Sequence, residues 1–205
     1  MTGCFIVLEG GDGSGKSTQA RLLVAALRAA GHIVTETFEP GATSTGAKIR
    51  SLLLDDDAPL DARAELLMMA ADRAQHVHEV IRPALAAGSF VVSDRFEPSS
   101  LAYQGIGRGL GADVVAGLSG FARDGLEPDL VVVLDVADSV AQQRRPIATD
   151  RMERAGNEFH SAVRAAYRSL AMEHGWALVD GEGPPDVVAD RVWSVVAPCV
   201  EVVSR

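Results

Sequence analysis

Short apolar runs alternate along this chain with longer segments in which apolar residues recur every three or four positions. The short runs are rich in Val, Ile, Leu and Phe and predict buried strands at 4–9, 32–38, 89–93, 130–136 and 176–180. The periodic segments predict helices at 16–30, 47–54, 61–87, 110–124, 138–144, 154–174 and 185–203. Strands that alternate with helices build βαβ units. The pattern therefore predicts one α/β domain over residues 1–205, with a parallel sheet covered by helices on both faces.

The longest periodic segment, 61–87, has clear signals at its ends. Asp61 suits an N-cap and Gly88 suits a stop, while Pro83 is expected to kink or tighten the last turns. Arg73 is expected to border an apolar stripe on this helix. The predicted stripe consists of Leu66, Ala70, Ala74, Val77 and Ile81.

A glycine-rich loop follows the first predicted strand and leads into the first predicted helix. It matches the phosphate-binding pattern G-x-x-x-x-G-K-[ST] over Gly10, Gly11, Asp12, Gly13, Ser14, Gly15, Lys16, Ser17 and Thr18. Glycines let backbone N–H groups point at phosphate oxygens, and the helix N-terminus adds partial positive charge. We expect Lys16 to reach the β- and γ-phosphates of ATP and Ser17 to ligate Mg²⁺.

Composition narrows the possible partners. The 205 residues are 47% hydrophobic and carry a net charge of −9, which fits a folded protein and disfavours a nucleic-acid ligand. No apolar run is long enough to span a membrane, and no basic leader precedes the first strand. Cys4 and Cys199 lack motif spacing. We therefore expect a cytoplasmic protein with reduced thiols and no membrane partner.

Several further stretches resemble the thymidylate kinase family. They are LEGGDGSGKST (8–18), FEPGATSTGAKIRSLLL (38–54), ADRAQHV (71–77), DRFEPSSLAYQGIGRG (94–109), PDLVVVLDV (128–136) and DRMERAGNEF (150–159). The resemblance implies the three-layer P-loop kinase fold, with a central sheet of about five parallel strands and a short lid. It also implies transfer of the γ-phosphoryl group of MgATP to dTMP, in dTTP synthesis.

The resemblance assigns roles around the acceptor. Asp94 would help Ser17 hold Mg²⁺, Arg95 would bind the acceptor phosphate, and Asp12 would bind the 3′-hydroxyl. The remaining dTMP contacts implied by the family fall on Glu39, Pro40, Arg50, Met69, Arg73, Ser100, Tyr103 and Gln104.

The chain departs from the family pattern at two positions near the acceptor. Met69 stands where the family usually has an aromatic ring stacked on thymine, and Phe38 stands where Arg is usual. Met is apolar and can pack on a ring face with less fixed geometry.

Phosphoryl transfer needs positive charge around the migrating group more than it needs a general base. One subtype of the family places an Arg at the position of Gly13, which cannot supply it here. The charge is therefore expected from a lid over about 144–153, with Arg144 and Arg145 at ATP and Arg151 as a catalytic residue beside Lys16, Arg95 and Asp12.

Other functions fit parts of these data. Another P-loop nucleotide or metabolite kinase would share the loop, and so would a nucleotide-dependent switch or a kinase that has lost turnover. The absence of a guanine-specific N-K-x-D signature argues against a GTPase switch, whereas Arg73 and Arg95 favour an acceptor that already bears phosphate. Family resemblance also implies a homodimer.

Overall fold

The computed structural model describes residues 3–55, 59–144, 152 and 154–203. Within them the chain forms one sheet of parallel strands in the order β2-β3-β1-β4-β5. The strands are β1 (Phe5–Glu9), β2 (Val34–Phe38), β3 (Phe90–Asp94), β4 (Leu130–Asp135) and β5 (Ala177–Asp180). The predicted α/β class and five-stranded parallel sheet are confirmed.

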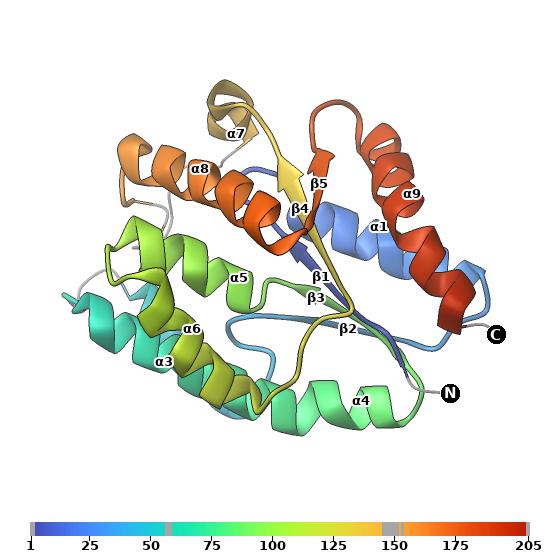
Figure 1. Ribbon diagram of the computed structural model, residues 1–205, viewed down its shortest axis with the longest axis horizontal. Helices are drawn as coiled ribbons and strands as arrows, with labels where there is room; N and C mark the ends of the chain where they lie inside the picture. The colour runs from blue at the N-terminus through green and yellow to red at the C-terminus, as the bar shows by residue number, and fades with distance from the viewer. Residues whose placement is uncertain (1–2, 56–58, 145–151, 153, 204–205) are drawn as a thin grey trace.

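Helices cover both faces of this sheet (Figure 1). One face carries α1 (Lys16–Ala29) and α9 (Pro185–Val203), which pack on each other and on the strands. The opposite side carries α3 (Ala62–His76), α4 (Arg82–Ala86), α5 (Glu97–Ser100), α6 (Ala112–Arg123) and α8 (Asn157–His174). Two further helices are present: α2 (Ser44–Leu54) packs on α3, and α7 (Asp138–Arg144) follows β4.

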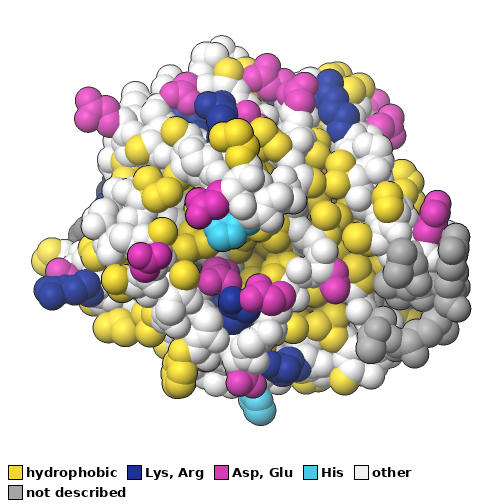
Figure 2. All heavy atoms as spheres, viewed as in Figure 1, with side chains coloured by type: hydrophobic (Ala, Val, Ile, Leu, Met, Phe, Trp, Pro, Cys, Tyr) yellow, Lys and Arg dark blue, Asp and Glu magenta, His cyan; other side chains and the backbone are white. Residues whose placement is uncertain are grey.

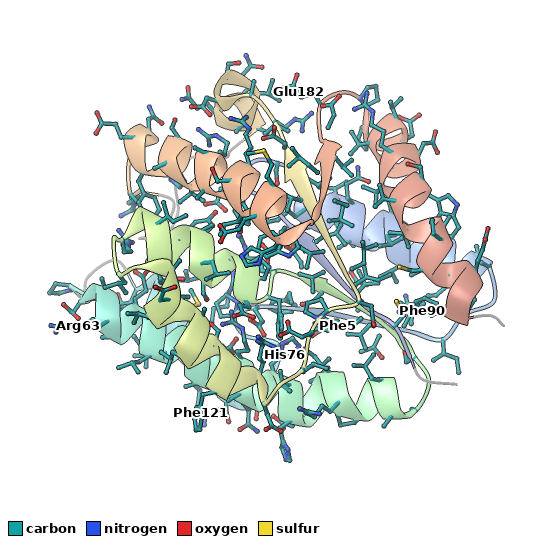
Figure 3. All side chains as sticks on the ribbon, viewed as in Figure 1. Phe5, Arg63, His76, Phe90, Phe121 and Glu182 are labelled. Atoms are coloured by element: carbon teal, nitrogen blue, oxygen red, sulfur yellow. The ribbon has the colours of Figure 1, made fainter. Side chains whose placement is uncertain are left out.

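Each face of the sheet has its own apolar core. Leu27 of α1 and Val192 of α9 pack with Phe90 of β3 on one side. Phe5 of β1 packs with Tyr167 of α8 on the other side, and Figure 3 labels both Phe5 and Phe90. Because β1 lies between two strands and between two cores, all of its residues are buried. No helix in the described part of the chain is both long and apolar enough to cross a bilayer.

The structure corrects several predicted boundaries. The helix expected at 47–54 begins earlier, at Ser44, because the Thr43 hydroxyl caps it by accepting from the Gly46 N–H at 2.9 Å. The helix expected from residue 154 begins at Asn157, after Gly156. The predicted Asp61 cap is confirmed, since its side chain accepts from the Arg63 N–H.

The long helix predicted at 61–87 is interrupted rather than uniform. A π-helical segment, η1 (Val77–Ile81), separates α3 from α4, and Pro83 lies in the first turn of α4. A proline has no N–H to continue the α-helical ladder, so the turn before it widens. The predicted apolar stripe is wrong at Ala74, which is exposed, because Arg73 and His76 are buried in its place.

A helical segment at 97–107 was not predicted at all. It consists of α5 followed by the π-helical η2 (Leu101–Gly107). Pro98, two serines and two glycines read locally as a loop, but η2 packs closely against α8. A Cβ at Gly107 would lie 2.7 Å from the Phe159 ring. Tertiary packing therefore overrides the local preference.

A buried acid, Asp72, joins α3 to the turn after β2. Asp72 is 1% exposed, and its Oδ1 accepts from the Gly41 N–H at 3.0 Å. Its Oδ2 is buried with no hydrogen-bond partner among the described residues. Burial, followed by the nearby charge of Glu39, raises the pKa of Asp72 to about 6.

This raised pKa predicts a pH-dependent loss of stability. Between about pH 4 and pH 6 the folded chain keeps a proton on Asp72 that the unfolded chain releases, so the free energy of unfolding falls as pH rises. In the wild type this fall in the free energy of unfolding should amount to roughly 3 kcal/mol, and it should be absent in Asp72→Asn. Urea denaturation at pH 4, 5, 6 and 7 measures it, with Asp113→Asn on the surface of α6 as control. Parallel pH profiles for wild type and Asp72→Asn would contradict the assignment.

Candidate active site

The phosphate loop connects the end of β1 to the start of α1. Gly10, Gly13 and Gly15 have φ values of 138°, 83° and 94°, in the region that favours glycine. A Cβ at Gly10 would lie 2.5 Å from the Leu134 carbonyl oxygen. At Gly15, the N-cap of α1, no side chain caps the helix. The backbone at this helix start is therefore available to an anion.

Gly13 lies directly against α7. A Cβ there would lie 2.3 Å from the Ala141 carbonyl oxygen. The arginine that one family subtype carries at this position would therefore have no room here.

Lys16 is almost fully buried beneath the loop. Its exposed fraction is 6%, and Nζ donates to the Gly11 carbonyl at 3.0 Å. Burial and then the charge of Arg95 lower the pKa of Lys16 to about 8. A bound phosphate would oppose this shift, because an anion favours the charged ammonium.

Ser17 and Asp94 meet at the carboxyl ends of β1 and β3. The Ser17 hydroxyl donates to Asp94 Oδ2 at 2.5 Å. Asp94 Oδ1 is buried and has no hydrogen-bond partner among the described residues. A hydroxyl beside an unsatisfied carboxylate oxygen is the donor set that Mg²⁺ takes together with water and phosphate. These residues therefore fit the metal that the loop motif implies.

Asp12 and Arg95 form an ion pair across the cavity. Arg95 Nη2 lies 2.5 Å from Asp12 Oδ1, while Nη1 donates to the Ser99 hydroxyl at 3.1 Å. The Arg95 guanidinium also lies 5.1 Å from the centre of the Tyr103 ring. Burial raises the pKa of Asp12, but Arg95 and Lys16 together outweigh it and hold the pKa at about 2. Arg95 itself has φ 77°, an unusual backbone for a non-glycine residue that sits at a cluster of charges.

Glu9, at the end of β1, was not predicted as a site residue. It is fully buried and accepts four hydrogen bonds. The donors are the Phe96 N–H at 2.8 Å, the Ser99 N–H at 3.2 Å, the Ser99 hydroxyl at 2.7 Å and the Tyr167 hydroxyl at 2.8 Å. Glu9 thus fixes the backbone that follows Arg95. An acid at the end of a fully apolar run was the available signal.

Arg73 was expected to border the apolar stripe of its helix, but it lies inside the protein with 2% exposed. It pairs with Glu39 at 2.9 Å and donates to the Ser119 hydroxyl, the Phe96 carbonyl and the Ser100 hydroxyl, each at 3.1 Å. The other carboxylate oxygen of Glu39 lies 2.9 Å from Nδ1 of His76, which points inward from α3 in Figure 3. Arg73 therefore holds Glu39, Phe96 and Ser100 of the cavity wall in place from the interior of the protein.

Arg50 and Phe38 lie at the mouth of the cavity. The Arg50 guanidinium lies 5.9 Å from the centre of the Phe38 ring, and Nη1 donates to the Pro40 carbonyl at 2.8 Å. Phe38 therefore supports a cation at the place where the family usually has one.

One open cavity of about 590 Å³ brings most of the predicted residues together. Its lining includes the predicted residues Asp12, Gly13, Gly15, Lys16, Ser17, Thr18, Glu39, Pro40, Arg50, Met69, Arg73, Asp94, Arg95, Ser100, Tyr103, Gln104 and Arg144. Gly10, Gly11 and Ser14 belong to the loop but not to this lining.

The predicted lid is the least described part of the site. Arg144, at the end of α7, lines the cavity and donates to the Gly181 carbonyl at 2.8 Å. Arg145 and Arg151 lie outside the described residues, as does most of the segment 144–153.

Comparison with known proteins gives a consistent result. A family model described as thymidylate kinase matches residues 8–192. A thymidylate kinase of Solidesulfovibrio magneticus is 47% identical, with 94% of this chain and 98% of the relative covered. Those of Synechococcus sp. strain JA-2-3B'a(2-13) and Halothermothrix orenii are 48% and 44% identical, over 95% and 98% of this chain and 94% and 99% of the relatives. With its phosphate loop, its paired Asp12 and Arg95 and this identity along nearly its whole length, the chain belongs to the thymidylate kinase family.

Proposed function

We propose that this protein transfers the γ-phosphoryl group of MgATP to dTMP, giving ADP and dTDP. The observation that carries the proposal is a single cavity in which the phosphate loop, paired with Arg95 through Asp12, faces the polar residues of η2. Donor and acceptor would then meet in one cavity, where positioning supplies much of the rate enhancement. The proposed domain spans residues 1–205.

On the donor side, the glycine loop would hold the ATP phosphates and Lys16 would reach the β- and γ-oxygens. The pKa of Lys16, lowered to about 8 by burial and Arg95, would rise again as phosphate replaces the Gly11 carbonyl as its partner. Arg144 would add positive charge at the same end of the cavity. Arg145 and the catalytic role of Arg151 stay predictions from the sequence.

Ser17 and Asp94 would hold Mg²⁺. A metal held there would supply positive charge to offset the negative charge that develops on the phosphate oxygens. Asp94 Oδ1, buried without a partner among the described residues, supports this assignment. The Ser17–Asp94 hydrogen bond keeps both oxygens at the loop before the metal binds.

On the acceptor side, Arg95 would bind the phosphate of dTMP. Its guanidinium is already held in place by Ser99 and Tyr103, so binding the phosphate would require the exchange of only one partner. A dianionic phosphate would replace Asp12 as that partner, and Asp12 would then be free to accept from the 3′-hydroxyl. Arg50, supported by Phe38, would add a second cation. Both acids and cations are therefore in place before substrate enters.

The base and sugar would be held by α5, η2 and α3. Tyr103 would pack near the deoxyribose, and Ser100 and Gln104 would hydrogen-bond the base edge. Met69 would cover the face of the ring. Arg73 would act largely through Glu39 and Ser100, because its donors are already engaged with protein groups.

A homodimer is part of the proposal. Phe121 on α6 is 86% exposed and points outward in Figure 3, and Leu67 on α3 is 57% exposed. In Figure 2 apolar side chains are exposed at the lower left, where Figure 1 places these two helices. Burying such side chains would favour association.

Sedimentation equilibrium should therefore give about twice the mass of the chain for the wild type. Phe121→Glu should give the mass of the monomer, because it places a charge in the apolar contact. A monomeric wild type would refute the dimer.

The reaction also fits the cytoplasmic location expected from the sequence, which stays a prediction.

The acceptor is tested by measuring ADP release with MgATP and dTMP, dUMP, dCMP, AMP, GMP or thymidine. We expect strong turnover with dTMP, weaker turnover with dUMP and little with the rest. Lys16→Ala should abolish turnover with every acceptor, because the γ-phosphoryl charge is then uncompensated. Preference for another monophosphate would keep the kinase and reject dTMP. ATP binding without turnover on any acceptor would reject the kinase.

The metal assignment predicts a specific defect in Asp94→Asn. The Mg²⁺ concentration for half-maximal rate should rise roughly 10- to 100-fold, because a neutral amide replaces a carboxylate. The rate is measured against free Mg²⁺ at saturating ATP and dTMP, and EDTA should stop wild-type turnover. Asp113→Asn, far from the loop, serves as control. An unchanged Mg²⁺ dependence in Asp94→Asn would remove this residue from the metal site.

A further inference from the structure

Gln104 lies in the cavity wall with a buried acid behind it. Gln104 is 1% exposed and lines the cavity, and its Nε2 donates to Glu65 Oε1 at 2.8 Å. Glu65, on α3, is fully buried and is not part of the cavity lining. Glu65 therefore contacts the Gln104 amide from behind the cavity wall. Of these two residues, only Gln104 faces the cavity.

Arg108 holds Glu65 as an acceptor at both of its oxygens. Arg108 Nε donates to Oε1 at 3.3 Å and Nη2 donates to Oε2 at 3.2 Å. The guanidinium also lies 4.6 Å from the centre of the Phe159 ring, and Nη2 lies 3.5 Å from the Met152 sulfur. Arg108 is thus fixed by α8 as well as by the ion pair.

This arrangement determines which end of the Gln104 amide meets a ligand. A carboxylate paired with an arginine can only accept hydrogen bonds, so only the NH₂ group of the amide can face it. The carbonyl oxygen of the same planar amide then points away from Glu65. Without Glu65 either orientation of the amide would be possible.

We propose that Glu65 and Arg108 are positioning residues that make Gln104 present its carbonyl oxygen to the base, and so select pyrimidines with a hydrogen on N3. This inference rests on the proposed function. Thymine and uracil carry an N3–H that can donate to Gln104 Oε1. Cytosine has an acceptor at N3, so two acceptors would face each other and both would lose a hydrogen bond.

Glu65→Gln tests the proposal. The new side chain has nearly the same shape but can donate as well as accept, so the Gln104 amide can turn over. The ratio of kcat/KM for dTMP over dCMP should fall about tenfold or more. The ratio for dTMP over dUMP should not change, because both rings carry N3–H.

Arg108 variants give a second route that does not depend on how Glu65→Gln folds. Arg108→Met should lower the dTMP/dCMP ratio, because loss of the guanidinium favours the protonated form of the buried Glu65, which can then donate to Gln104. Arg108→Lys keeps the positive charge and should retain most of the ratio. The double variant should add little to either single change, since both act through one amide.

Glu97→Gln is the matched control. Glu97 is another buried acid, and it pairs with the partly exposed Arg123 at 2.7 Å outside the cavity lining. It should lose a similar ion pair and keep the base ratio. An unchanged ratio in folded Glu65→Gln and Arg108→Met enzymes would overturn the proposal while dTMP turnover stands. Wild-type enzyme without dTMP turnover would instead reject the proposed function.

Discussion

Four hydrogen bonds that converge on Glu9 hold the active-site end of the sheet together. They reach from the central strand to the backbone after Arg95 and to Tyr167 on α8, and they connect the sheet to two separate helical elements. A carboxylate in an apolar strand is costly unless its oxygens are satisfied, so this position demands its donors. Satisfying Glu9 fixes the turn that carries Arg95. The geometry of Asp12, Arg95 and the cavity between them therefore follows from one buried acid.

The parts of the fold that were predicted correctly depend on local pattern. Strands β1 and β4 are uninterrupted apolar runs, and the glycines before Lys16 require a turn that few other sequences would make. Residues that bind phosphate follow strand ends, so the sheet edge collects them without any long-range information. The phosphate loop, Asp94 and Arg95 could thus be placed in one cavity from sequence and family resemblance.

The parts that failed depend on contacts between distant segments. The helical segment 97–107 has the composition of a loop and is helical because α8 and α6 pack against it. Arg73 was expected only to border the apolar stripe, but Glu39, distant in sequence, pairs with both Arg73 and His76 in the interior. Glu65 and Arg108 could not be assigned to the site because their effect passes through Gln104. A hydrophobic pattern indicates which apolar residues are buried, but it does not indicate the partner that stabilises a buried charge.

The close contact between Gly13 and α7 limits how this active site can evolve. Moving a cationic side chain into the phosphate loop would need room beside the Ala141 carbonyl and a backbone that tolerates φ 83°. A single codon change at Gly13 therefore meets a steric barrier before it can confer any catalytic benefit. To make that room, α7 would have to lie farther from the loop.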